Sequence, residues 1–243
     1  VLDKEFKKLK IAVPRQFEQA KGLDKDVAKV FEDTKAWFVS KGATIEVVDL
    51  PILDASIASY YIIALSEAAS NLSRFDGIRY GNRQDPGQGY DELYTKTRSE
   101  GFGPEVKRRI MLGTYALSSG YYDAYYKKAQ QVRTLIKNEF NKAFEKYDVI
   151  VTPTSPTTAF GIGSKSTNPM EMYLADICTV SINIAGLPAI SIPCGVDGNG
   201  LPIGMQIIGN KFEEETILKA AYAYEQETNF RANYKPTFKG GVQ

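Results

Sequence analysis

The first 50 residues contain two short apolar runs separated by a stretch with helical spacing. Residues 9–13 form an apolar run that ends at Pro14, and residues 43–48 form an alternating β-branched run, so both predict strands. Between them, Asp24 suits a helix N-cap, Gly42 suits a C-terminal stop, and apolar side chains recur every three or four positions. This order predicts a β-α-β unit with parallel strands.

From residue 56 to residue 144 the pattern is mainly helical. Apolar side chains recur at helical spacing over residues 56–74, and residues 76–90 are rich in Gly, Pro and Asn, which predicts a loop. Pro104 opens a second predicted helix that runs to a break at Gly120. A charged, tyrosine-rich helix is predicted from residue 121 to about residue 144.

The last 100 residues combine a buried strand, a hairpin and a helix. Residues 148–152 (DVIVT) predict a buried strand that ends at Pro153, and residues 154–169 have the composition of a loop. A segment from residue 170 to about residue 185 leads into strands at 189–194 and 203–208, joined by a turn at 197–200. An amphipathic helix is predicted over 213–227. We expect an α/β fold with a mixed, mostly parallel sheet flanked by helices.

Composition places the chain among globular proteins. The 243 residues are 43% hydrophobic and 24% charged, and 30 Lys and Arg residues balance 29 Asp and Glu residues. Because the formal net charge is only +1, no overall field attracts nucleic acid or an anionic membrane. No uninterrupted apolar run approaches the roughly 20 residues that span a bilayer, and we expect a cytoplasmic protein. The start at Val1 suggests a piece of a longer chain.

The chain contains no histidine, and its two cysteines, Cys178 and Cys194, are far apart and outside any CxxC pair. The absence of histidine excludes Ser-His-Asp catalysis, Cys-His catalysis and His-ligated zinc within these residues. We expect both cysteines to be small core residues, and we predict no metal site.

A few charged and aromatic side chains are candidates for ligand binding. Arg108 or Arg109 could present a guanidinium group to a carboxylate, although the residues alone favour solvated surface charges at both positions. Asp176 lies among apolar residues, and a helix there would place its carboxylate beside an apolar face. It could bind an ammonium group or form a structural salt bridge. Of the adjacent Tyr60 and Tyr61, only one can lie on the apolar stripe of its helix.

Three segments, residues 59–81, 103–114 and 174–193, resemble the C-terminal half of the amidase signature family in order and spacing. The motifs FDGIRYG, EVKRRI and NIAGLPAISIP are similar to those of the A subunits of tRNA-dependent amidotransferases. The resemblance implies that residues 1–243 form the C-terminal portion of an amidase signature domain. It also implies that the N-terminal catalytic portion is absent, with its nucleophilic serine, its second serine on a cis peptide and its lysine base. We therefore assign no catalytic residue to this chain.

The same resemblance implies a role in glutamine recognition. Tyr60 would contact the bound glutamine through its hydroxyl group, Arg109 would hold the α-carboxylate, and Asp176 would pair with the α-ammonium group. The choice of Arg109 over Arg108 rests on the family register. The complete protein of this kind hydrolyses glutamine and supplies ammonia that converts Glu-tRNA(Gln) to Gln-tRNA(Gln), and Asp-tRNA(Asn) to Asn-tRNA(Asn).

The resemblance further implies a heterotrimer with B and C subunits. ATP and Mg²⁺ would be used by the B subunit, which would also bind the tRNA, so this chain would hold no cofactor. On its own the chain would be inactive. Two alternatives are open: the C-terminal half of another amidase signature hydrolase, or a non-catalytic scaffold whose tyrosine-rich helix forms an interface.

Overall fold

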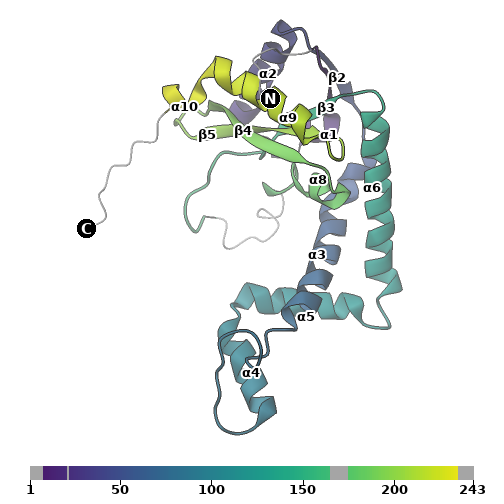
Figure 1. Cartoon of the computed structure of the whole chain (residues 1–243), viewed down its shortest axis with the longest axis vertical. Coiled ribbons are helices and arrows are strands. Elements are labelled where there is room, and N and C mark those ends of the chain that lie inside the picture. The colour runs from purple at the N-terminus through teal and green to yellow at the C-terminus, as the bar shows by residue number, and fades with distance from the viewer. Residues whose placement is uncertain (1–7, 21, 165–174, 235–243) are drawn as a thin grey trace, which may run out of the picture. The chain divides into compact units, whose positions relative to one another are not determined.

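The computed structural model describes residues 8–20, 22–164 and 175–234, and the chain divides into two compact units (Figure 1). The first, which we call the sheet unit, comprises residues 1–57 and 135–243. The second, the helical unit, comprises residues 58–134. Both boundaries fall inside helices, because α3 (Ser56–Leu72) leaves the sheet unit and α6 (Lys128–Phe144) returns to it.

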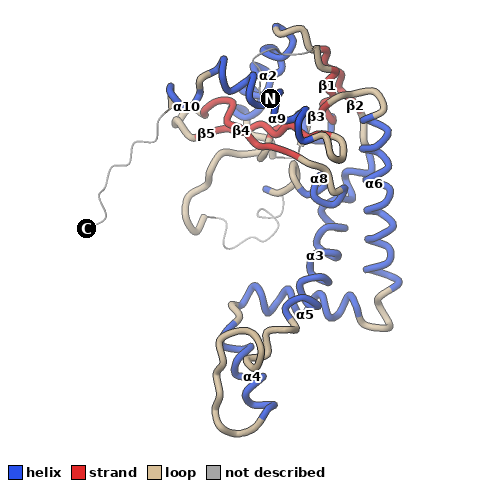
Figure 2. The backbone as a smooth tube through the Cα atoms, viewed as in Figure 1, coloured by secondary structure: helices blue, strands red, loops and turns tan. Residues whose placement is uncertain are grey.

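The sheet unit is built on five strands (Figure 2). In chain order they are β1 (Lys10–Pro14), β2 (Thr44–Val48), β3 (Val149–Pro153), β4 (Ala189–Val196) and β5 (Pro202–Gly209). Their order in the sheet is β2-β1-β3-β5-β4. Strand β1 pairs in parallel with β2 and β3, whereas β5 pairs antiparallel with β3 and β4. Only β5 therefore opposes the common strand direction, which confirms the predicted mixed, mostly parallel sheet.

Helices α2 (Lys25–Ser40) and α9 (Glu214–Thr228) pack against one face of this sheet. Alternate strand residues such as Val13, Val151 and Ile207 are fully buried beneath them, as the period-two side-chain pattern of a strand requires. Asp24 caps α2 by accepting a hydrogen bond from the Asp26 amide, as predicted. Among the residues of the sheet unit that the structure describes, the shorter helical segments are α1 (Arg15–Glu18), η1 (Pro51–Ala55), α8 (Val180–Ala185) and α10 (Phe230–Asn233).

The helical unit contains α4 (Tyr90–Gly101), α5 (Pro104–Leu117) and most of α3. The sequence pattern did not predict α4, because its 12 residues are largely polar and only Leu93 and Thr97 are buried. The predicted helix from residue 121 is also interrupted, because it begins with the π-helical turn η2 (Asp123–Lys127) and continues as α6.

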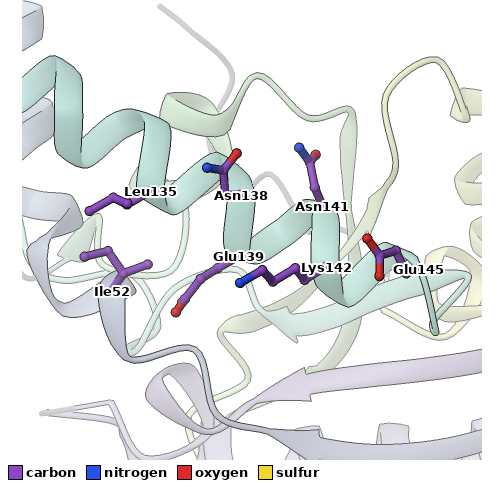
Figure 3. Close-up of a pocket in the computed structure, with 7 residues that line it drawn as sticks. All are labelled: Ile52, Leu135, Asn138, Glu139, Asn141, Lys142 and Glu145. Atoms are coloured by element: carbon purple, nitrogen blue, oxygen red, sulfur yellow. The ribbon is translucent and has the colours of Figure 1, made fainter.

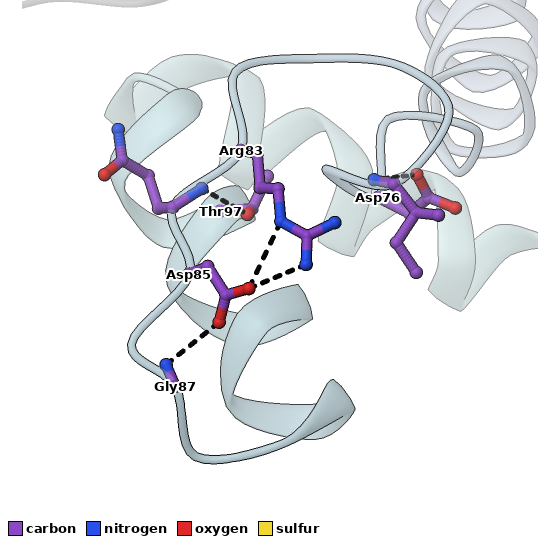
Figure 4. A network of polar contacts seen from close by, with 7 residues as sticks. Asp76, Arg83, Asp85, Gly87 and Thr97 are labelled. Atoms are coloured by element: carbon purple, nitrogen blue, oxygen red, sulfur yellow. Dashed lines mark hydrogen bonds and ion pairs between the residues drawn. The ribbon is translucent and has the colours of Figure 1, made fainter.

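The predicted loop before α4 is held together by its own polar side chains (Figure 4). Asp76 accepts hydrogen bonds from the Ile78 and Arg79 amides, and Asp85 accepts from Arg83 and from the Gly87 amide. These backbone and arginine donors hold the pKa of both carboxyl groups below the usual range. The loop therefore presents a defined conformation despite its glycine and proline content.

Helices α3 and α5 approach each other closely at Gly113. A methyl group at this position would lie 2.0 Å from the carbonyl oxygen of Leu65 and 2.8 Å from the Cβ of Ala69. Replacing Gly113 by alanine is therefore expected to force the two backbones apart and to lower the free energy of unfolding by about 1–3 kcal/mol. Chemical denaturation of the complete protein would measure this loss.

Gly120 provides the matched control for that substitution, because an added methyl group there would meet no atom within 4 Å. Gly120→Ala should change the free energy of unfolding by no more than about 0.5 kcal/mol. Equal stability of the Gly113→Ala and Gly120→Ala proteins would contradict the close approach of the two helices.

The segment Pro51–Leu72, which contains η1 and α3, is long and apolar enough to cross a membrane by length and composition alone. Polar residues interrupt the apolar residues of this segment, so the sequence pattern did not predict a membrane-spanning helix there. Among the residues that the segment buries are the polar Ser56, Ser59 and Ser66. A face with three buried serines suits close packing against protein, and the contact at Gly113 places part of α3 in such packing.

Candidate functional site

The candidate arginines lie in the first half of α5 and share one carboxylate. Glu105, in the first turn of the helix, lies three and four residues before Arg108 and Arg109, so both can reach it. Its Oε2 accepts a hydrogen bond from Arg108 Nε at 2.9 Å and lies 2.6 Å from Arg108 Nη2. Its Oε1 accepts a hydrogen bond from Arg109 Nε at 2.8 Å. The two arginine donors hold the pKa of Glu105 below its usual range.

The two arginines use their donors differently. Arg108 brings two of its nitrogens to Glu105, whereas the contact of Arg109 with Glu105 is made through Nε. Within the described part of the chain, Glu105 is the only ion-pair partner of Arg109. The terminal nitrogens of Arg109 are therefore the ones that a carboxylate could still engage in a bidentate pair.

Tyr60 and Tyr61 lie near Arg109 within the helical unit. The hydrogen bond that Arg109 donates to Glu105 is the largest cause that raises the pKa of Arg109, and the phenolate forms of Tyr61 and Tyr60 raise it further. Both tyrosines are partly buried, and their rings form an edge-to-face pair with centroids 5.2 Å apart. Neither ring is fully excluded from solvent, so both differ from an ordinary core tyrosine.

Asp176 has a different setting from the one predicted. The residue lies in a turn at 176–179 that precedes α8, not in a helix beside an apolar face, and its side chain is exposed. Its backbone carbonyl accepts hydrogen bonds from the Thr179 and Val180 amides at 3.0 and 3.1 Å. In the described residues the Asp176 carboxylate has no ion-pair partner, so the structural salt bridge is not formed there.

The turn that carries Asp176 is fixed to the central sheet by a buried amide. Gln206 on β5 donates from Nε2 to the Cys178 carbonyl at 2.6 Å and to the Thr152 hydroxyl on β3 at 2.9 Å. Gln206, Thr152 and Cys178 are all at least 96% buried. The Cys178 carbonyl is thereby bonded to the sheet, which holds the turn there, and α8 begins at Val180.

Two of the three predicted site residues belong to the same unit of the structure. Tyr60 and Arg109 are neighbours in the helical unit, whereas Asp176 belongs to the sheet unit. Sequence reasoning missed Glu105 as a member of the site, although its spacing of three and four residues from two arginines was a readable signal. Across the described residues, no group of three or more Cys, Asp or Glu side chains is arranged to hold a metal ion.

A separate pocket of about 480 Å³ lies beside α6 in the sheet unit (Figure 3). Ile52 and Leu135 provide apolar walls, and Glu139 and Lys142 provide charge. Burial raises the pKa of Glu139, and its Oε2 atom is buried without a hydrogen-bond partner in the described structure. Lys142 extends toward Glu139 along the helix (Figure 3) and supplies a nearby compensating charge.

The cysteines have the structural character that the sequence predicts. Cys178 is fully buried, Cys194 is partly buried, and neither forms a disulfide. Burial raises the pKa of the Cys178 thiol to about 12 and that of the Cys194 thiol to about 11. Both are therefore protonated at neutral pH and are poor nucleophiles.

The family model that matches this chain agrees with the names of the proteins that are similar to it. Residues 2–218 match the family model described as Amidase. The A subunit of glutamyl-tRNA(Gln) amidotransferase from Oceanobacillus iheyensis is 56% identical over 227 residues, which are 93% of this chain and 46% of that protein. The corresponding Listeria monocytogenes protein is 59% identical over 226 residues, with the same shares. The chain thus spans about half the length of these relatives.

Solved structures extend the comparison to the fold. The crystal structure of the same amidotransferase component from Thermotoga maritima has a TM-score of 0.70 and 39% identity, covering 93% of this chain and 44% of that one. An allophanate hydrolase from Kluyveromyces lactis has a TM-score of 0.69 at 21% identity, covering 90% and 32%. The second likeness shows the fold alone.

Proposed function

Because this chain belongs to the amidase family, we propose that it is the glutamine-binding portion of the A subunit of a glutamyl-tRNA(Gln) amidotransferase. The observation that carries this proposal is Arg109, which keeps its terminal nitrogens available beside Tyr60. The high identity to proteins of that name, over 93% of the chain, supports the same assignment.

The proposed chemistry of recognition follows from the form of the substrate. Glutamine carries an ammonium group and a carboxylate on one carbon, so it needs an anion and a cation to hold that end. Arg109 can bind the carboxylate through a bidentate pair, and Asp176 can bind the ammonium group with its exposed carboxylate. Tyr60 would contact the bound molecule through its hydroxyl. A molecule held in this way presents its distal amide in one orientation to a nucleophile, which is how positioning contributes to rate.

We place the bond-breaking chemistry outside these 243 residues. The nucleophilic serine, the second serine and the lysine base of the family would belong to the portion of the relatives that this chain does not cover, which is about half of their length. The two thiols do not substitute for them, because both are protonated at neutral pH. This chain would contribute recognition, and the rest of the subunit would release ammonia from the amide.

We further propose that the complete subunit works in the cytoplasm as part of a heterotrimer. The released ammonia would pass to a B subunit that activates misacylated tRNA with ATP and Mg²⁺, and a C subunit would complete the assembly. The formal net charge of +1 on this chain agrees with tRNA being bound elsewhere, because phosphate contacts require clustered positive charge.

Asp176 provides a direct test of this proposal. Replacing Asp176 by asparagine in the complete subunit keeps the shape of the side chain and removes its charge. The KM for glutamine is expected to rise about 10- to 100-fold, because an ammonium group would lose its charged partner. Steady-state assay of ammonia release measures the effect.

Glutaric acid monoamide, which has the terminal amide and the carboxylate but no amino group, is the control substrate. Asp176→Asn should leave its kcat/KM within about twofold, because the lost interaction is absent from that molecule. If the substitution lowers the rates of both substrates equally, or neither, Asp176 does not bind the ammonium group of glutamine.

A further inference from the structure

Glu105 lies between two arginines of the same helix and contacts both of them. One of its oxygens faces Arg108 and the other faces Arg109, and these contacts come from three and four residues along the same helix. All three side chains are about half exposed, so their pairing adds little to folding stability. What the cluster does change is the charge around Arg109 and the orientation of its side chain.

The charges in this cluster are arranged to leave Arg109 cationic. Arg108 approaches Glu105 with two nitrogens and so offsets the carboxylate charge. Because two guanidinium groups share one carboxylate, the cluster keeps a net positive charge. A carboxylate paired with Arg109 alone would instead cancel the charge on which an anionic ligand depends.

The hydrogen bond also restricts the orientation of Arg109. A free arginine side chain has several rotatable bonds, and binding a ligand in one geometry would freeze them. Glu105 accepts from Nε, which lies on the edge of the guanidinium plane next to the side chain. Fixing that nitrogen fixes the plane of the group while the terminal nitrogens stay accessible to a second carboxylate.

We propose that Glu105 is a positioning residue that orients Arg109 for the α-carboxylate of the amino-acid substrate. This inference rests on the proposed function, because it needs Arg109 to bind that carboxylate. Glu105 itself does not touch the substrate, and its effect reaches the reaction only through Arg109. The loss of Glu105 should weaken binding of substrates that carry an α-carboxylate and leave other amides unaffected.

The experiment compares Glu105→Ala and Glu105→Gln in the complete subunit. Ammonia release is measured with glutamine and with 4-aminobutanamide, which keeps the terminal amide and the amine but lacks the α-carboxylate. Glu105→Ala is expected to raise the KM for glutamine about tenfold with kcat within about twofold, and to leave kcat/KM for 4-aminobutanamide within about twofold. Glu105→Gln should recover most of the loss, because its carboxamide oxygen still accepts from Arg109 Nε.

Two further variants separate the possible outcomes. Arg109→Ala is the reference that must discriminate between the two substrates, and if it does not, the proposed function fails. Glu215→Ala removes another exposed helical pair, that with Lys219, and should leave both substrates unchanged. If Arg109→Ala discriminates but Glu105→Ala does not, or if Glu105→Ala impairs both substrates equally, only the positioning role is overturned. A Glu105→Gln protein as impaired as Glu105→Ala also overturns it.

Discussion

Replacing Arg109 by alanine in the complete subunit is expected to raise the KM for glutamine at least about 100-fold. The substrate carboxylate would lose its charge-assisted, bidentate partner. Steady-state kinetics of ammonia release over a wide range of glutamine concentrations would measure the change, with kcat determined separately from KM.

Arg108→Ala is the matched control for that substitution. Arg108 lies one position earlier on α5 and directs its nitrogens at Glu105. Its removal takes away the charge that offsets Glu105 but not the proposed carboxylate ligand, so it should raise the KM for glutamine about tenfold, well below the effect of Arg109→Ala. The comparison also decides between the two arginines, whose assignment by sequence rested on register alone. A larger effect at Arg108 than at Arg109 would contradict the role given to Arg109.

The 243-residue chain on its own is expected to release no ammonia from glutamine above the uncatalysed background. Residues that bind the substrate do not break its amide C–N bond without a nucleophile. The two cysteines do not supply one, because both thiols are protonated at neutral pH. An enzyme-coupled ammonia assay at high protein concentration would measure this, with the complete subunit tested in parallel.

Co-production of this chain with the remaining portion of the subunit provides the companion experiment. Restored hydrolysis in the mixture, abolished again by Arg109→Ala in this chain, is the expected result. Robust hydrolysis by the chain alone would place a nucleophile within these residues and would refute the proposal that the nucleophile lies outside them.

The periodicity of the chain predicted the sheet unit well because its strands and helices bury apolar side chains. All five strands and the helices α2 and α9 lie within a few residues of their predicted bounds. Burial and the sequence pattern agree in β1, β3, β5 and the two helices, whereas β2 and β4 at the two edges of the sheet are only partly buried. The helical unit was harder, since α4 buries little more than Leu93 and Thr97 and its sequence is mostly polar.

The candidate site was predictable only in part, and for a physical reason. Family resemblance suggested Tyr60 and Arg109, and both lie in the helical unit. The partnership of Arg109 with Glu105 depends on rotamers that no pattern of hydrophobic residues specifies. The setting of Asp176 was predicted wrongly, because the bond from Gln206 to the Cys178 carbonyl joins residues 28 positions apart. The part of the predicted loop from residue 165 to 169 lies outside the described residues.

The buried amide of Gln206 opposes movement of the turn that carries Asp176. If the turn carrying Asp176 moved away from the sheet, Gln206 would lose its bond to the Cys178 carbonyl and leave a buried donor unsatisfied, at a cost of roughly 1–3 kcal/mol. Displacement of the turn is thus coupled to disruption of the interior between β3 and β5. An arriving amino acid would meet the Asp176 carboxylate on a stiff support, so little ordering entropy would be lost on that side when the ligand binds.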